Sequence, residues 1–220
     1  MCGRYCCYCV DLLKDVFDIK DSEYSEFKKN YNIPPFTNIP VVANDKNNIT
    51  HLVPMYWQLI PDFSEEFKSS YNMFNSRLDS FEKPYKKRLL MRSRCIIPAN
   101  NYYEWKTEGH KKIPFLIKKE NEDLMFMAGV YSVWKSEKEK KLSCSIITTE
   151  AQQSIACIHH RMPLILGKDY VNNWLDKSIN DVPEINKLIE SNIHNDLESY
   201  QVSNMLNKSS NNNVSLLDKI

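Results

Sequence analysis

The sequence predicts a single α+β domain built around largely antiparallel β-sheets. Short apolar runs bounded by Pro and Asn predict many strands, and only a few stretches show helical spacing. The strands do not alternate with helices in a regular βαβ period, which argues against a parallel sheet. A chain of 220 residues fits one domain with a substantial core.

The expected strands share apolar or β-branched residues at consecutive or alternating positions, with turn residues at their ends. They are residues 39–43, 50–60, 94–98, 102–106, 113–118, 124–131, 142–149 and 199–203. An extended turn is expected at residues 32–36, because each proline there disfavours helix in the residue before it.

The expected helices share apolar residues three or four positions apart. They are residues 8–19, 80–92, 150–157, 169–176 and 183–191. Pro84 lies inside the first turns of the second helix, and Pro183 opens the last one, where a proline is allowed.

The remaining segments are polar. Residues 20–30 are expected to be a solvated surface segment and residues 62–70 a loop. The domain is expected to span residues 2–207. Residues 208–220 are expected to form a flexible tail, because residues 209–213 have low complexity and show no partner-binding motif.

The composition limits the classes of function. A net charge of +1 means that any nucleic-acid surface has to be a local patch. No apolar segment precedes Arg4 and Asp11, so neither a signal peptide nor a membrane span is expected. We therefore expect an intracellular protein whose seven cysteines are free thiols. Cys6, Cys7 and Cys9 have no second cysteine or histidine knuckle downstream, so no metal is expected.

The first four residues, Met1-Cys2-Gly3-Arg4, place a nucleophile at the chain terminus. Removal of Met1 would leave the α-amine and the thiol of Cys2 on one two-carbon unit. These groups ordinarily titrate at about 7.7–8.0 and about 8.5, so part of each is unprotonated near neutral pH. Such an aminothiol condenses with aldehydes to a thiazolidine, or its thiol acts alone in acyl transfer. Alternatively, Cys2 merely follows the start codon.

Polar residues within apolar strands are the next candidates, because an unpaired buried polar group costs free energy. Glu104 lies between Tyr103 and Trp105 and suits general acid/base work, unless it faces solvent at a strand end. His159 can move a proton, although a lone histidine is usually structural.

Two further residue types suit a phosphate-bearing substrate. Arg161, two positions after His159, can bind a phosphate and oppose protonation of the histidine. Asn75 can orient a nucleophile or a sugar oxygen, and Arg77 can hold a phosphate.

Taken in order, these motifs resemble one known family. The chain carries terminal Cys-Gly-Arg, then Asn-x-Arg, then Tyr-Tyr-Glu-Trp-Lys, then Ile-His-x-Arg-Met-Pro. This set is similar to the SOS response-associated peptidase family of abasic-site processing proteins, and the resemblance covers residues 2–207. It implies a barrel-like core flanked by helices and a covalent sensor of DNA damage that needs no cofactor.

The resemblance also implies residue roles. Cys2 would crosslink to the aldehyde of an abasic site in single-stranded DNA as a thiazolidine. Asn75 would position the Cys2 amine and Glu104 would manage protons. His159 would shuttle a proton and assist β-elimination, as in a lyase, or crosslink reversal. His160 occupies a variable position and receives no role.

DNA-binding roles follow from the same resemblance. Phosphate contacts position a strand without reading its sequence, and aromatic or proline side chains can stack where a base is missing. The expected phosphate and stacking residues are Arg4, Arg77, Arg161, Thr148, Pro35 and Phe63. The chain departs from the family at Gln58 and Asp62, where Gly is frequent, and at Phe63, where some relatives carry Trp. DNA binding implies a nucleoid location in a prokaryote or a nuclear one in a eukaryote.

Three other functions are alternatives to abasic-site processing. Amidohydrolases with an N-terminal cysteine also begin Met-Cys-Gly, but they rely on Asn-Gly and Gly-Asp dipeptides, and none of the four glycines here forms either. A non-catalytic reader of modified DNA would not need Cys2, Glu104 and His159 together. A protease acting in trans is suggested by the family name alone, and the sequence supports at most self-removal of a short N-terminal segment.

Overall fold

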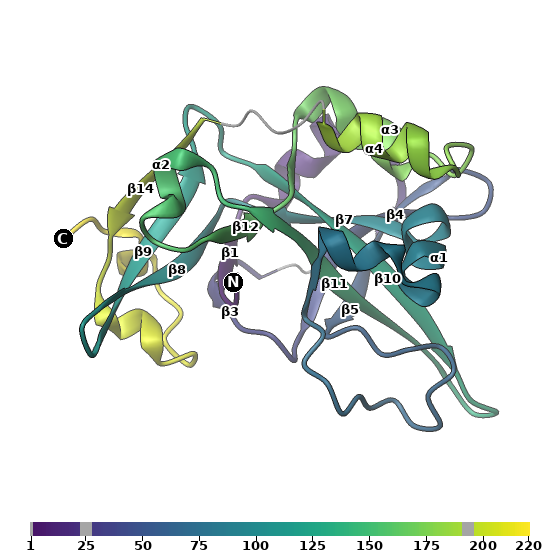
Figure 1. The fold of residues 1–220 in the computed structure, drawn as a ribbon, viewed down its shortest axis with the longest axis horizontal. Coiled ribbons are helices and arrows are strands. Elements are labelled where there is room, and N and C mark those ends of the chain that lie inside the picture. The colour runs from purple at the N-terminus through teal and green to yellow at the C-terminus, as the bar shows by residue number, and fades with distance from the viewer. Residues whose placement is uncertain (1, 23–27, 191–195) are drawn as a thin grey trace.

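A computed structural model describes residues 2–22, 28–190 and 196–220 of the chain. Its centre is a closed barrel of five strands in the order β11-β10-β7-β4-β5 (Figure 1). The barrel strands are β4 (Asn38–Asn44), β5 (Thr50–Trp57), β7 (Arg94–Ala99), β10 (Met125–Lys135) and β11 (Lys140–Glu150). Four of the five pairings are antiparallel, and a parallel pairing of β5 with β11 closes the ring.

Four short strands extend the barrel. β2 (Ile19–Ser22) pairs with β5, and β13 (Ile165–Leu166) pairs with β10. β6 (Asn75–Arg77) and β12 (Arg161–Pro163) both pair with β11. This last arrangement places residues from two distant parts of the chain on either side of β11.

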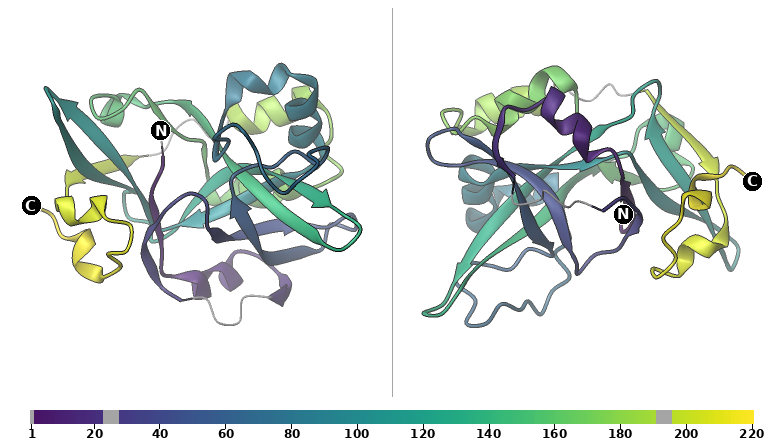
Figure 2. Two further views of the ribbon diagram at one scale, coloured as in Figure 1. Left: turned by 90° about the horizontal axis from the view of Figure 1, so that it is seen from below. Right: turned by 180° about the vertical axis from the view of Figure 1, so that it is seen from behind.

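A second sheet of five strands lies beside the barrel, in the order β14-β9-β8-β1-β3 (Figures 1 and 2). Its strands are β1 (Tyr5–Cys7), β3 (Asn30–Ile33), β8 (Asn101–Glu108), β9 (Lys111–Lys119) and β14 (Leu197–Gln201). β7 passes into β8 at Asn100, whose side-chain oxygen accepts the amide of Tyr8 at 2.7 Å. One buried cluster, containing Tyr5, Ile97 and Tyr102, joins this sheet to the barrel.

Three of the helices cover the side of the barrel away from the second sheet. α1 (Pro84–Arg92), α3 (Val171–Leu175) and α4 (Val182–Glu190) share a second apolar cluster with β7 and β10, while α2 (Gln153–Ala156) lies by β14 (Figure 1). The 3₁₀ turns are η1 (Val10–Asp15), η2 (Leu78–Glu82), η3 (Lys168–Tyr170), η4 (Asn204–Asn207) and η5 (Val214–Leu217). No helix in the described ranges is both long and apolar enough to span a bilayer.

The predicted α+β class and barrel-like core are confirmed, whereas three predicted helices are shorter than expected. Of residues 150–157, only Gln153–Ala156 are helical. Only Val10–Asp15 of residues 8–19 is helical, as a single 3₁₀ segment. Residues 80–92 divide at Lys83, and α1 begins at Pro84, because proline lacks the amide that a helix interior needs. Part of the expected surface segment at residues 20–30 forms β2 and β3, and residues 23–27 lie outside the described ranges.

Residues 208–220 pack against the second sheet, in contrast to the expected flexible tail. Leu216 is buried in one cluster with Tyr103 and Leu206. The side-chain amide of the buried Asn32 donates to the carbonyl of Asn211 at 2.8 Å. The buried Leu216 therefore anchors the C-terminal segment, because residues 209–213 have no apolar side chain that could be buried.

Arg94 fixes the helices to the barrel. It is buried at the start of β7, and its guanidinium donates to five backbone carbonyls. Those carbonyls lie at or just beyond the C-terminal ends of α1 and α3, where a helix leaves its last carbonyls unpaired. Burial lowers the pKa of Arg94 to about 10, so it stays charged at neutral pH.

Replacing this guanidinium should loosen the helical layer. Arg94→Lys keeps the charge, but three donors on one atom cannot reach five carbonyls. We expect the free energy of unfolding to fall by about 3 kcal/mol or more, measured by urea denaturation. The exposed Arg92→Lys should change it by less than about 0.5 kcal/mol. Equal effects of the two substitutions would contradict this role.

Candidate functional site

The four candidate catalytic residues come from four separate segments that meet where the barrel adjoins the second sheet. Cys2 precedes β1, Asn75 begins β6, Glu104 lies on β8 and His159 lies between α2 and β12. The side-chain amide of Asn75 donates to the Cys2 carbonyl at 2.7 Å. The charge of Glu104 acts on both Cys2 and His159, which places the carboxylate near each of them.

Cys2 is fully buried, and its position is set by the pairing of β1 with β8. The Arg4 carbonyl accepts the Tyr103 amide at 2.9 Å and the Cys2 thiol at 3.9 Å. Burial raises the pKa of this thiol, and the neighbouring negative charge of Glu104 adds to the effect. The thiol is therefore protonated at neutral pH, and its use as a nucleophile requires a base close by.

His159 is held in a defined orientation. Its Nδ1 lies 3.0 Å from the backbone amide of Arg161 and 3.1 Å from the carbonyl oxygen of the same residue. The ring stacks on His160 with centroids 4.4 Å apart. Burial lowers the pKa of His159, while the carboxylate of Glu104 opposes that shift. At neutral pH the ring is therefore uncharged and can accept or donate a proton.

Two of the expected phosphate-binding arginines, Arg77 and Arg161, lie on either side of β11 near Thr148. Arg77 and Thr148 are paired residues of β6 and β11, and Arg161 begins β12 on the other side of β11. Arg161 donates from Nη2 to the Thr148 carbonyl at 2.6 Å and to its hydroxyl at 3.1 Å. Arg77 is exposed and paired with Asp79. Thr148 thus holds one guanidinium in place, and the other is open to solvent.

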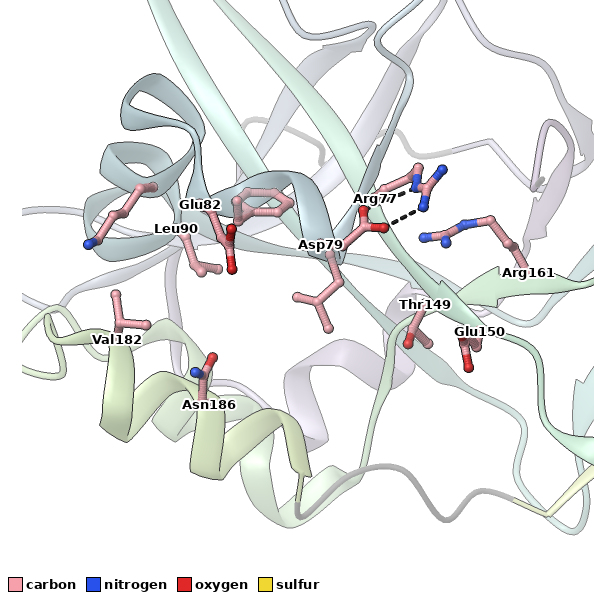
Figure 3. A pocket seen from close by; sticks show the side chains of 12 residues that line it. Arg77, Asp79, Glu82, Leu90, Thr149, Glu150, Arg161, Val182 and Asn186 are labelled. Carbon is pink, nitrogen blue, oxygen red and sulfur yellow. Dashed lines mark hydrogen bonds and ion pairs between the residues drawn. The ribbon is translucent and has the colours of Figure 1, made fainter.

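A pocket of about 650 Å³ opens beside these two arginines (Figure 3). It runs between α1 and α4, and both Arg77 and Arg161 stand at its edge, where Asp79 pairs with Arg77. The four candidate catalytic residues are not among its lining residues. The buried Nε of Arg161 has no hydrogen-bond partner within the described ranges. The arginine pair therefore places two guanidiniums at the edge of a pocket that the four candidate catalytic residues do not line.

The other expected DNA contacts are less concentrated. Arg4 is half-buried, and its Nη1 donates to Asn32 at 2.7 Å and to the Leu206 carbonyl at 3.2 Å. Phe63 is 73% exposed and packs edge-on against Tyr85 of α1. Pro35 is half-buried in the turn between β3 and β4. The roles of Arg4, Pro35 and Phe63 on DNA stay predictions.

Two aromatic residues near the candidate site, Phe36 and Tyr102, have no role in the sequence-based prediction. Phe36 is 45% exposed beside Pro35, and its ring meets Phe74 at 5.8 Å, one residue before Asn75. Tyr102 lies two positions before Glu104 and is fully buried. The period of two along a strand could have indicated Tyr102, because alternate residues share one face.

Cys6, Cys7 and Cys9 are placed by packing and hydrogen bonding within the fold. The Cys6 sulfur lies 2.9 Å from both the Tyr103 hydroxyl and the Tyr31 carbonyl. Cys7 is buried in the central cluster, whereas Cys9 is partly exposed. Across residues 2–22, 28–190 and 196–220, no group of three or more His, Cys, Asp or Glu side chains is arranged to hold a metal ion.

Comparison with known proteins identifies the family of this chain. A family model described as SOS response associated peptidase matches residues 1–209. The abasic site processing protein YoaM of Bacillus subtilis is 38% identical over 223 residues, covering 99% of this chain and 98% of that protein. The abasic site processing protein YoqW of the same organism is 35% identical, covering 99% of each.

The fold is shared as well. A crystal structure of a protein from Bacteroides thetaiotaomicron superposes with a TM-score of 0.80 at 27% identity, over 100% of this chain and 97% of that one. Sequence and structure therefore agree along almost the whole chain. The chain belongs to the SOS response associated peptidase family.

Proposed function

We propose that this protein, once Met1 is removed, captures abasic sites in single-stranded DNA through a covalent bond to Cys2. The observation that carries the proposal is the meeting of Asn75, Glu104 and His159 around a buried N-terminal cysteine. The naming of YoaM and YoqW as abasic site processing proteins supports the same substrate. Such a protein acts inside the cell, on DNA.

The chemistry uses both nucleophiles of Cys2. Its amine attacks C1′ of the ring-opened sugar, and Glu104 passes the two amine protons in turn to the sugar oxygen. That oxygen leaves as water, which gives an imine and returns Glu104 to its carboxylate form. The Cys2 sulfur then adds to the imine carbon, and the C=N electron pair moves to nitrogen. The thiol proton passes through Glu104 to that nitrogen, which closes a thiazolidine. Asn75 holds the Cys2 backbone through its carbonyl during these steps.

His159 acts in β-elimination and in reversal of the crosslink. A neutral imidazole can take a proton from the sugar, which permits β-elimination at the imine stage, and can return one during reversal. Lyase activity and crosslink reversal are therefore secondary activities of the same site. Self-removal of Met1 by the Cys2 thiol is a third.

The noncovalent encounter depends on charge. Arg77 is exposed and lines the same pocket as Arg161, so we expect one phosphate to contact both guanidiniums. A strand without a base at the lesion offers no sequence to read there, and backbone contacts suffice to position it. The exposed Phe63 is placed to stack on a base.

Loss of the nucleophile should abolish capture. Cys2→Ala should form no SDS-resistant adduct with single-stranded DNA that carries an abasic site. Cys157→Ala, which removes an exposed thiol, should form the adduct at the wild-type rate. Intact-mass measurement should show that Met1 is absent from the reactive protein. An adduct formed by Cys2→Ala at the wild-type rate would falsify the proposal.

The pH profile of reversal should report His159. Because burial lowers its pKa, protonation begins below the ordinary value of about 6.5. The release of DNA from preformed crosslinks should be independent of pH near neutrality and fall only at lower pH. His159→Ala should slow release about a hundredfold and remove that acid limb. If the release rate of the wild-type protein began to fall at a pH above the ordinary histidine pKa, His159 would not be neutral at pH 7.

Salt should weaken the encounter through the arginines. Binding of abasic single-stranded DNA should decrease with salt, and each lost phosphate contact should reduce the log–log slope by about 0.7. Arg77→Gln should therefore bind more weakly with a shallower slope, measured by fluorescence anisotropy with Cys2→Ala protein. The matched control is Lys140→Gln, which removes the same charge from the tip of the β10–β11 hairpin. Equal slopes for the two substitutions would count against Arg77.

A further inference from the structure

Tyr102 carries a buried polar group that the fold does not use. The side chain is fully buried, and its hydroxyl has no hydrogen-bond partner in the part of the chain that the structure describes. An unpaired buried hydroxyl is destabilising, and folded proteins keep few of them. Such groups are expected at functional sites, where a reacting partner completes the bond.

The position of Tyr102 follows from strand geometry. Tyr102 and Glu104 lie two residues apart on β8 and therefore on one face of the strand. Tyr102 pairs with Tyr5 of β1 and shares the central buried cluster with Cys2. The intervening Tyr103 faces the opposite side, where it packs in a different cluster.

The electrostatics agree with a position beside the thiol. Burial raises the pKa of Tyr102, and negative charge on Cys2 or Glu104 would raise it further. The phenol is therefore protonated throughout the working pH range and can only donate to an anion beside it. Glu104 and the N-terminal amine act on the Cys2 thiol through their charges, and Glu104 acts in the same way on His159 and Tyr102. Tyr5 of β1 belongs to the same buried cluster.

A backbone hydrogen bond of Arg4 and the N-terminal amine both lower the pKa of the Cys2 thiol. Two nearby side-chain donors, by contrast, are bonded to other groups. The Asn75 amide donates to the Cys2 carbonyl, and the Arg4 guanidinium faces Asn32 and the Leu206 carbonyl. Glu104 opposes a thiolate through its charge. A sulfur anion at Cys2 therefore needs a neutral donor, and the Tyr102 hydroxyl is buried in the same cluster without a partner.

We propose that Tyr102 is a further catalytic residue, whose hydroxyl donates a hydrogen bond to the Cys2 sulfur during thiazolidine closure. This role rests on the proposed function. The thiol proton passes to the Glu104 carboxylate, the sulfur forms its bond to C1′, and the C=N electron pair moves to nitrogen. Nitrogen then takes the proton from Glu104. Tyr102 keeps its own proton and stabilises the sulfur while it is negatively charged.

A pair of adjacent tyrosines gives the test. Tyr102→Phe removes an unpaired hydroxyl, so the melting temperature should be unchanged or higher, while thiazolidine closure should be about tenfold slower. Tyr103→Phe removes a hydroxyl that bonds to Cys6 and to the Tyr31 carbonyl. It should lower the melting temperature and leave the closure rate unchanged.

The slowed step can be identified directly. Borohydride reduces an imine but leaves a thiazolidine intact, so reactions with abasic single-stranded DNA are quenched with and without it. Tyr102→Phe should give wild-type total capture with borohydride and about tenfold less stable adduct without it at early times. The deficit should shrink as the pH rises, because more of the thiol ionises unaided. Wild-type yields in both quenches, or a fall in melting temperature matching that of Tyr103→Phe, would overturn the proposal.

Formaldehyde as a second substrate tests the role of Tyr102 independently of DNA. Formaldehyde converts an N-terminal cysteine to a thiazolidine without any DNA, and peptide mass spectrometry detects the added carbon on Cys2. Tyr102→Phe should again close about tenfold more slowly than wild type. If the wild type reacts with formaldehyde but not with abasic DNA, the proposed function fails while Tyr102 is still tested. Equal formaldehyde rates in wild type and Tyr102→Phe would overturn the role of Tyr102.

Discussion

The pairing of β1 with β8 is the constraint on which the candidate site depends. One carbonyl, that of Arg4, accepts both the Tyr103 amide and the Cys2 thiol. A shift of this register by one residue would turn every side chain of β1 to the opposite face of the sheet. Cys2 would then leave the junction with the barrel, and the amide of Asn75 would lose the carbonyl that it binds.

Buried polar groups have two different roles in this molecule. Arg94 has five carbonyl partners and holds two helices on the barrel, so its charge serves stability. By contrast, the Tyr102 hydroxyl, the Asn75 carbonyl oxygen and the Arg161 Nε are buried without partners among the described residues. All three belong to or adjoin the candidate site, where a bound substrate would be the missing partner.

Most strands could be predicted because each has a local apolar pattern, as in residues 94–98 and 142–149. Closure of the barrel could not, since the parallel pairing of Trp57 with Cys144 joins segments far apart in sequence. The tail shows a further limit, because low complexity at residues 209–213 predicts disorder. Contacts from Asn32 hold that segment in place nonetheless.

The sequence by itself determined the family and the chemical groups available, because Cys2, Asn75, Glu104 and His159 stand in recognisable motifs. Only the tertiary structure decided how those groups meet and in which protonation state. The raised pKa of the Cys2 thiol and the inclusion of Tyr102 both arise from packing across two sheets. Burial and the distance between charges depend on contacts between remote segments, and no local pattern records them.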